Sequence, residues 1–185
     1  MAKNLIKNTH AATALEFALI APVLLLLIFA IIEITGVMLA SSVLEDAVRA
    51  AGRAGITGYT PAGMTRDQFV LQTVQQNLVY LNPSNLTFTT EVYDSFADIG
   101  KPEPYTDTNH NGHYDLGEPY TDVNGNGQWD ADMGAAGKGG PGAIVVYKVS
   151  YPWQIVTPVL LKYFGNNGQI NITASMVVQN EPYGS

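Results

Sequence analysis

The sequence predicts an α+β protein in which a long N-terminal transmembrane helix continues into a domain where a second helix packs on an antiparallel sheet of three or more strands. Three observations carry this prediction: an uninterrupted apolar stretch near the N-terminus, one later segment with helical spacing of apolar residues, and three segments with strand alternation. With 185 residues, the chain has the size of one domain and an appendage.

The apolar stretch is long enough to cross a bilayer. It runs from Phe17 to Ile32 without a charge and continues past Glu33 to Ala40. Helical rise gives it a length of about 36 Å, against a hydrocarbon core of about 30 Å. A cleaved secretory signal peptide is the alternative, but its apolar core is shorter, at roughly 7–15 residues. The pattern therefore favours a transmembrane helix that extends, with its continuation, over residues 16–55.

The charges that flank this helix predict its orientation. Lys3 and Lys7 precede the apolar stretch, and the far side opens with acidic residues. By the positive-inside rule, residues 1–15 form a cytoplasmic leader and residues 56–185 form an exported domain.

Two carboxylates adjoin the apolar stretch. Glu33 falls near the outer headgroups by helical rise, where we expect it to be solvated. Glu16 directly abuts the apolar residues, where an ionised group is costly unless it is paired. Glu16 therefore needs a partner.

Small residues recur four apart after the membrane span, which lets neighbouring helices approach closely. Packing against a partner chain and packing against the chain's own domain both fit this pattern. An ion pair between Glu45 and Arg49 is expected on the same helix. The small pairs are Gly36 and Ala40, Ala47 and Ala51, and Ala50 and Ala54.

The segment from Ala12 to Glu33, ATALEFALIAPVLLLLIFAIIE, resembles the start of TadE-like pseudopilins of the tight-adherence (Tad) pilus, which are relatives of type IV pilins. The later stretches LEDAVRAAGRAG and ITASMVVQNEPYG are similar to that family as well. The resemblance implies a pilin-like domain, a place in the bacterial inner membrane with the C-terminal domain in the periplasm, and incorporation into an extracellular pilus. Its implied partners are other pilus or pseudopilin subunits, the membrane assembly platform, the lipid bilayer and a prepilin peptidase.

The resemblance also implies roles for four residues. The peptidase would cut between Ala11 and Ala12, although the family normally has Gly where this chain has Ala11. Glu16 would then pair with the new N-terminal amine of a neighbouring subunit, with Phe17 as its companion.

The exported domain begins with a predicted helix at about 65–81. Thr65 and Gln68 fit a capping box, and apolar residues follow at helical spacing. Strand alternation then appears in three segments, which begin near Leu86, Ala143 and Gln169.

The charge of the chain is concentrated in one segment. The net charge is −7, and the seven acids between Glu103 and Asp132 account for all of it, because the other nine acids balance nine Lys and Arg. This distribution points to a cation partner for one segment and gives no support to nucleic-acid binding. The chain has no Cys, so a crosslink other than a disulfide would be useful to an exported domain.

That acidic segment, residues 103–133, contains the same loop twice with a period of fifteen residues. Glu-Pro-Tyr-Thr-Asp precedes an Asn, Gly and Asp pattern in both copies, which is the spacing of a calcium loop. Position 7 of such a loop ligates through its backbone carbonyl. A turn-rich linker without metal is the alternative. The first copy offers Asp107, Asn109, Asn111, His113, Asp115 and Glu118 as ligands.

The second copy lacks the twelfth ligand, because Met133 stands in its place. Either Asp132 shifts by one position, or Glu103 folds back across the pair, or the site is weaker and completed by water. We therefore expect one or two calcium ions, which would order an insertion too long to stay ordered unaided. The second copy offers Asp122, Asn124, Asn126, Gln128, Asp130 and Asp132.

These features predict a structural role: a membrane-anchored minor pseudopilin that helps to build or prime the pilus of the Tad secretion system and is rigidified by calcium. A membrane-anchored, calcium-dependent adhesin or binding module that never enters a filament is the alternative. An enzyme is not expected, because the chain has neither a Cys nucleophile nor a Gly-x-Ser-x-Gly elbow. Zinc at His110 and His113 is disfavoured, because the oxygen-rich ligands suit calcium.

Overall fold

The computed structural model describes residues 9–56, 59–157 and 168–182, with side chains from Ala12 onward. The leader before residue 9, with Lys3 and Lys7, lies outside them. The chain divides into two compact units. The span unit comprises Met1–Ala40 and Pro152–Ile172, and the head unit comprises Ser41–Tyr151 and Thr173–Ser185.

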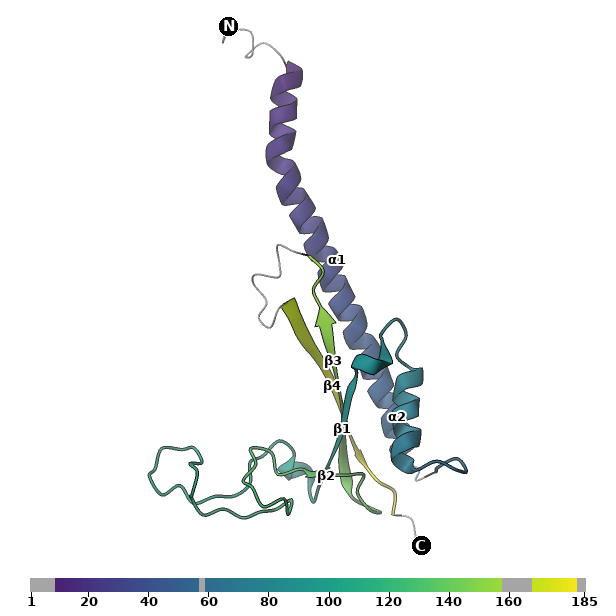
Figure 1. The fold of residues 1–185 in the computed structure, drawn as a ribbon, viewed down its shortest axis with the longest axis vertical. Coiled ribbons are helices and arrows are strands. Elements are labelled where there is room, and N and C mark those ends of the chain that lie inside the picture. The colour runs from purple at the N-terminus through teal and green to yellow at the C-terminus, as the bar shows by residue number, and fades with distance from the viewer. Residues whose placement is uncertain (1–8, 57–58, 158–167, 183–185) are drawn as a thin grey trace. The chain divides into compact units, whose positions relative to one another are not determined.

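Helix α1, Thr9–Ile56, is one continuous helix of 48 residues (Figure 1). It contains the predicted helix at 16–55, and Pro22 lies inside it. Its apolar residues from Leu15 to Leu39 are mostly exposed, and it is long and apolar enough to cross a membrane. In water such a surface would be strongly unfavourable, which suggests that α1 anchors the chain in a membrane; it is the one helix in the described part of the chain that could span it.

The small residues of α1 in the head unit pack within the chain. Ala47 and Ala51 are completely buried. A Cβ at Gly52 would meet the Met176 side chain, and one at Gly55 would meet Tyr147. Of the two alternatives for this small-residue pattern, the structure therefore shows internal packing.

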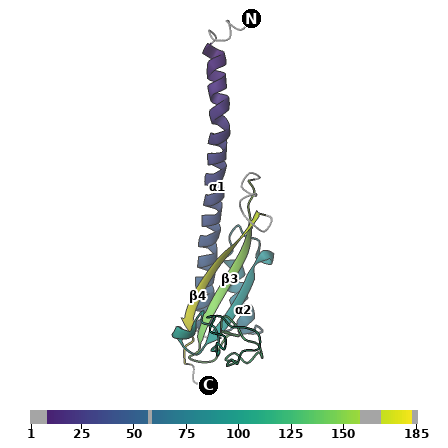
Figure 2. The ribbon, with the colours of Figure 1, turned by 90° about the vertical axis from the view of Figure 1, so that its left-hand side faces the viewer.

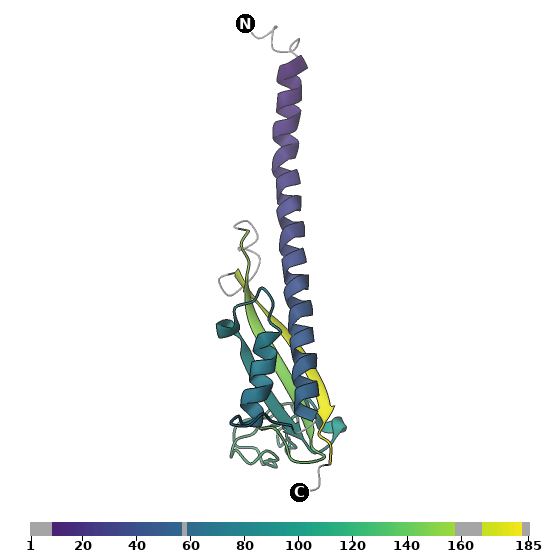
Figure 3. The ribbon, with the colours of Figure 1, turned by 90° about the vertical axis from the view of Figure 1, so that its right-hand side faces the viewer.

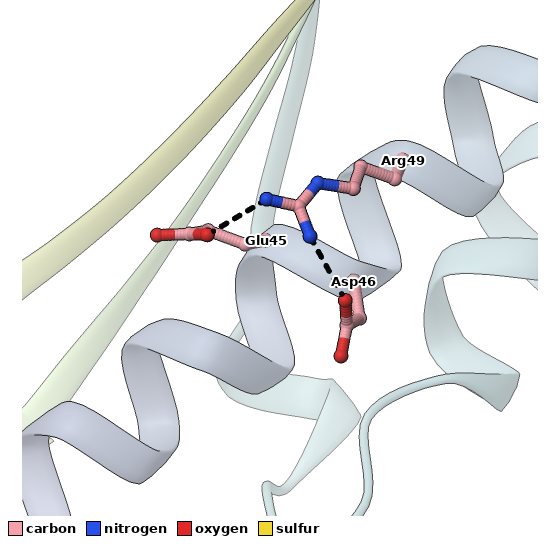
Figure 4. Close-up of polar contacts among 3 residues, drawn as sticks. All are labelled: Glu45, Asp46 and Arg49. Atoms are coloured by element: carbon pink, nitrogen blue, oxygen red, sulfur yellow. Dashed lines mark hydrogen bonds and ion pairs between the residues drawn. The ribbon is translucent and has the colours of Figure 1, made fainter.

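The exposed side of the same helix carries the predicted ion pair. Arg49 donates to Glu45 at 3.1 Å and to Asp46 at 3.3 Å (Figure 4). All three side chains are more than half exposed, so this cluster contributes little to stability and mainly keeps this side of the helix polar.

Helix α2, Arg66–Gln76, begins at the predicted capping box. The Thr65 side chain accepts from the Gln68 amide, and the Gln68 side chain accepts from the Thr65 amide at 2.9 Å. The helix ends earlier than the predicted residue 81. The chain turns at Asn77, and Leu78 and Leu81 are nevertheless buried, which explains why their spacing imitated a longer helix.

The sheet has four strands in the order β2-β1-β3-β4, which are Ala135–Ala136, Thr87–Tyr93, Ile144–Gln154 and Gln169–Gln179. Antiparallel pairing joins β1 to β3 from Thr87 opposite Ser150 to Tyr93 opposite Ile144. Figure 2 shows β3 and β4 side by side, and within the head unit their pairing continues to Asn180, whose amide donates to the Ala143 carbonyl. The α+β prediction is confirmed. The calcium character of the insertion stays a prediction.

The core of the head unit lies between the helices and one face of the sheet. Figures 1 and 3 show α2 and the C-terminal part of α1 along the sheet. Phe88 of β1 stacks on Tyr147 of β3 with ring centroids 6.1 Å apart. The side chains buried at this junction include Leu44, Val48, Val74, Val145, Tyr147 and Val149.

Candidate functional site

The duplicated insertion leaves the sheet after β1 and returns at β2 (Figure 1). Its two Glu-Pro-Tyr-Thr-Asp stretches pair with each other in antiparallel fashion, with Tyr105 opposite Tyr120. The Thr106 amide donates to the Pro119 carbonyl and the Thr121 amide donates to the Pro104 carbonyl, both at 2.8 Å. The sequence repeat is therefore also a structural repeat. The two paired stretches form one short antiparallel ribbon, and each loop begins at the end of one stretch.

The first loop is folded around the Asp107 carboxylate. The amides of Asn111 and Gly112 donate to its two oxygens at 3.2 Å and 2.8 Å. Gly112 has a φ of 80°, which permits the sharp turn that a calcium loop needs at position 6. Two further side-chain oxygens, those of Asn109 and Asn111, accept backbone amides two residues ahead.

The second loop repeats these bonds at the equivalent residues. Asp122 accepts the amides of Asn126 and Gly127 at 3.2 Å and 2.8 Å. Gly127 also has a φ of 80°. Because these bonds recur at equivalent positions, the shared sequence pattern favours the same turn in both loops.

Glu118 closes the first loop. One carboxylate oxygen accepts the Thr108 amide at 2.8 Å, and the other accepts the Asp115 amide at 3.0 Å. The side chain is only 7% exposed. Its carboxylate therefore reaches across from the last position of the loop to the residue after the first Asp.

Glu103 closes the second loop in the same way. One oxygen accepts the Val123 amide at 2.7 Å, and the other accepts the Asp130 amide at 3.1 Å. Glu103 is completely buried, and the indole of Trp129 donates to its carbonyl. Glu103 thus folds back across the pair and takes, in the second loop, the place that Glu118 has in the first.

Asp132 lies elsewhere. Its carboxylate accepts the Tyr93 hydroxyl at 2.8 Å and the Gly134 amide at 3.3 Å. The same hydroxyl also faces Glu91, and burial together with these carboxylates raises the pKa of Tyr93. Asp132 thus ties the end of the insertion to β1 and is not among the groups that the second loop gathers.

The oxygen donors of each loop are mixed in kind. Among the described residues, no group of three or more His, Asp or Glu side chains is placed to hold a metal ion. Each loop instead combines two Asp with two Asn and the closing Glu. The amide nitrogens of Asn109 and Asn111 point at Asp115, at 2.6 Å and 2.7 Å. Carboxylate and amide oxygens are the donors that a hard cation prefers, but turning either amide toward Asp115 would break the bond that its oxygen accepts from a backbone amide.

The remaining predicted ligands are placed by the same turns. His113 and Gln128 donate their amides to Asn111 and Asn126, at 2.8 Å and 2.7 Å, and both side chains are exposed. In the second loop, Asn124 and Asn126 donate to Asp130 as their counterparts do to Asp115.

An aromatic cluster joins the two loops, and the sequence analysis did not identify it. Tyr114 and Trp129, at position 8 of each loop, stack with ring centroids 4.3 Å apart. Tyr105 meets both rings edge-on, and Tyr120 meets Tyr114. The repeat carried the signal, because both copies place an aromatic residue at the same position. This cluster is the small apolar core of the insertion.

Backbone hydrogen bonds shift the titration of two loop carboxylates. The Gly112 amide, as the main cause, lowers the pKa of Asp107. The amides of Asp115 and Thr108 lower the pKa of Glu118. Both groups are therefore held in the ionised form that binds a cation.

The residues predicted for processing and assembly all lie on α1. The Ala11–Ala12 bond is inside the helix, and the side chain of Ala11 is outside the described part. Phe17 is 67% exposed. Glu16 is also exposed and has no hydrogen bond or ion pair in the described part of the chain.

Residues 11–53 match the family model described as TadE-like protein. The matched segment comprises most of α1 and none of the loops. No curated protein and no solved structure matches the chain. Over this N-terminal segment the chain is similar to TadE-like proteins, and this similarity supports a TadE-like Tad pilus assembly protein.

Proposed function

We propose that the protein is a minor pseudopilin, anchored in the bacterial inner membrane by α1, that helps to build or prime a Tad-type pilus and holds one or two calcium ions in its periplasmic head unit. The family match over residues 11–53 carries the pilus part. The pair of loops, each closed by a Glu, carries the calcium part.

The N-terminal helix supports assembly through Glu16. An exposed carboxylate next to an apolar helix surface is costly in a membrane unless a cation neutralises it. A neighbouring subunit cut between Ala11 and Ala12 would supply that cation as its free amine. Phe17 and the exposed apolar residues beyond it would pack on the same neighbour.

Calcium would act as the crosslink of the head unit. The insertion is bounded by β1 and β2, and its apolar content is essentially one aromatic cluster. Two cations would neutralise much of the charge of the seven acids and fix both loops to their shared ribbon. This role is structural, and so is the role of the TadE-like family.

The pilus part is tested in a strain that lacks the chromosomal copy of the gene. Wild-type protein should restore surface pili and co-purify with pilus components. Glu16→Ala should abolish both, while Glu45→Ala, on the same helix, should retain them. If the protein binds calcium but does not associate with pilus components, the adhesin is favoured instead.

The calcium part is tested by calorimetric titration of the full chain in nanodiscs, with magnesium as the competing ion. The full chain is needed because α1 supplies Leu44 and Val48 to the head-unit core. We expect up to two bound ions and a melting temperature that rises with calcium by mass action. Asp107→Ala should lose one ion. No heat of binding at millimolar calcium would reduce the loops to ordered turns.

A further inference from the structure

The span unit contains a contact that the pilus function does not require. Glu33 of α1 accepts three donors from the end of β3 and the residues that follow it: the Trp153 indole at 3.4 Å, the Val156 amide at 3.3 Å and the Thr157 hydroxyl at 2.9 Å. Glu33 was expected to be solvated, and it is instead half-buried by this segment.

The depth of this contact follows from the helix. If Phe17 marks the inner edge of the hydrocarbon, a core of about 30 Å ends some 20 residues later, near Val37. Glu33 then lies within the outer leaflet, about 6 Å below that edge. The segment that touches it must lie at the same depth.

The polar groups of this contact are hydrogen-bonded to one another, as they must be inside a lipid bilayer. A carboxylate at this depth is costly without donors, and so is a backbone amide without an acceptor. The hydrogen bond from the Val156 amide to Glu33 gives the carboxylate a donor and the amide an acceptor. Trp153 suits the interface, because its indole donates to Glu33 while its ring packs where a Cβ at Gly36 would be, 2.9 Å away.

The surroundings are apolar. A groove of about 330 Å³ lies between α1 and the two strand ends, lined by Ile34, Val37, Met38, Ile155 and Ile170. It is continuous with the exposed apolar surface of α1, and Val156 beside it is 78% exposed. An apolar groove that opens onto a membrane-spanning surface faces acyl chains.

We propose that residues 153–157 and the start of β4 form a second membrane contact, which lies in the outer leaflet beside α1 and holds a phospholipid acyl chain in the groove between them. The proposal rests on the membrane anchor but not on pilus assembly. It makes Glu33 the positioning residue of this contact, because its carboxylate holds the end of β3 against α1.

The two tryptophans provide matched probes. The full chain with Trp129→Phe is placed in nanodiscs of phosphatidylethanolamine and phosphatidylglycerol, one chain per disc, with bromine on the acyl chains at graded depths. Trp153 emission should be quenched most by bromine near the headgroup end and should resist aqueous acrylamide. The Trp153→Phe chain, which retains Trp129, should show the reverse.

A second probe guards against misfolding of either variant. The chain has no Cys, so Val156→Cys can be labelled with an environment-sensitive dye, with Leu24→Cys as the hydrocarbon control and the fully exposed Leu116→Cys as the aqueous control. The label at 156 should emit at shorter wavelength than the label at 116. Adding Glu33→Ala should shift it toward the aqueous value.

The outcomes separate the hypotheses. Acrylamide quenching of Trp153 as strong as that of Trp129 overturns the proposal while leaving the pilus function intact. If brominated lipid quenches Trp153 in single-chain discs but not when several chains share a vesicle, a neighbouring helix occupies the groove, and the proposal of an acyl chain there is wrong. If the label at position 24 emits as in water, α1 does not span the membrane there, and the proposed second membrane contact is wrong as well.

Discussion

Glu103 and Glu118 close two equivalent loops from opposite directions along the chain. Glu118 follows the loop that it closes, whereas Glu103 precedes both loops and closes the second. Each accepts the amide of the residue after the first Asp and the amide of the last Asp. The two loops therefore interlock, because the segment that opens the first loop also completes the second.

This interlock predicts the effect of Glu103→Gln. The new amide nitrogen would face a backbone donor in a fully buried place, which costs about 1–3 kcal/mol in the free energy of unfolding. It would also remove the carboxylate that completes the second loop. We expect calorimetry to show the loss of one calcium ion, together with a lower melting temperature in EDTA.

Asp132→Asn is the matched control, because Asp132 bonds to Tyr93 and not to the loop. It should retain both ions. If Asp132→Asn loses an ion and Glu103→Gln keeps two, the second site is completed by Asp132 and the assignment to Glu103 is wrong.

The two loops differ at position 4, and the difference predicts a stabilising substitution. His110 has a φ of 61°, while Gly125 at the equivalent place has a φ of 76°. A left-handed residue with a side chain costs roughly 1–2 kcal/mol, and glycine loses about 0.5–1 kcal/mol more entropy on folding. His110→Gly should therefore stabilise the metal-free loop by about 0.5–1 kcal/mol. Thermal unfolding followed by Trp129 emission measures this.

The reverse exchange, Gly125→His, provides the control. It should lower the midpoint of the same transition, because it brings the same strain into the second loop. A His110→Gly midpoint equal to or below that of the wild type would mean that the His110 side chain makes a contribution larger than its strain.

The strands were predictable because their apolar residues alternate along the chain over most of their length. The predicted segment that begins at Gln169 coincides with β4, and the one from Ala143 is displaced from β3 by a single residue. The two-residue strand β2 carries no alternation from which it could be predicted. The end of α2 was missed because Leu78 and Leu81 remain buried after the helix has ended, and sequence spacing records burial and not dihedral angles.

The loops were predictable to the level of spacing. Positions 1, 3, 5, 6 and 9 follow from local turns, which short-range sequence determines. The choice between Asp132 and Glu103 is a long-range contact, which depends on how the two Glu-Pro-Tyr-Thr-Asp stretches pair at Tyr105 and Tyr120. Spacing within one loop cannot reveal this contact. The repeat of Glu-Pro-Tyr-Thr-Asp does indicate it, because Glu103 and Glu118 hold the same position in the two copies.

Acid should open the metal-free loops. Asp107 and Glu118 have pKa values lowered by backbone donors, so each contributes stability above its unfolded pKa of about 4, and this is lost as pH falls through the lower folded value. Trp129 emission in EDTA should be constant from neutral pH to about 5 and should report opening below about 4. Asp107→Asn should flatten this acid transition. An unchanged profile in that variant would contradict the role of Asp107.

Gly55 predicts how tightly α1 joins the sheet. A Cβ there would overlap the hydroxyl of Tyr147 and lie 2.7 Å from its ring carbon Cζ. Ala is the better helix former by about 1 kcal/mol, but forced overpacking costs typically 1–3 kcal/mol. Tyr147 is 1% exposed and stacked on Phe88, so it cannot move aside cheaply. Gly55→Ala should therefore lower the free energy of unfolding of the head unit.

Gly140→Ala is the control for this change, because nothing lies within 4 Å of the added Cβ. It should stay within about 0.5 kcal/mol of the wild type in denaturant unfolding. If Gly55→Ala is equally neutral, Tyr147 has room to shift and the helix packs more loosely than the structure shows. If Gly55→Ala is destabilising while calcium binding persists, then the junction of α1 with the sheet and the loops are independent elements, and the rigidity of the head unit has two separate sources.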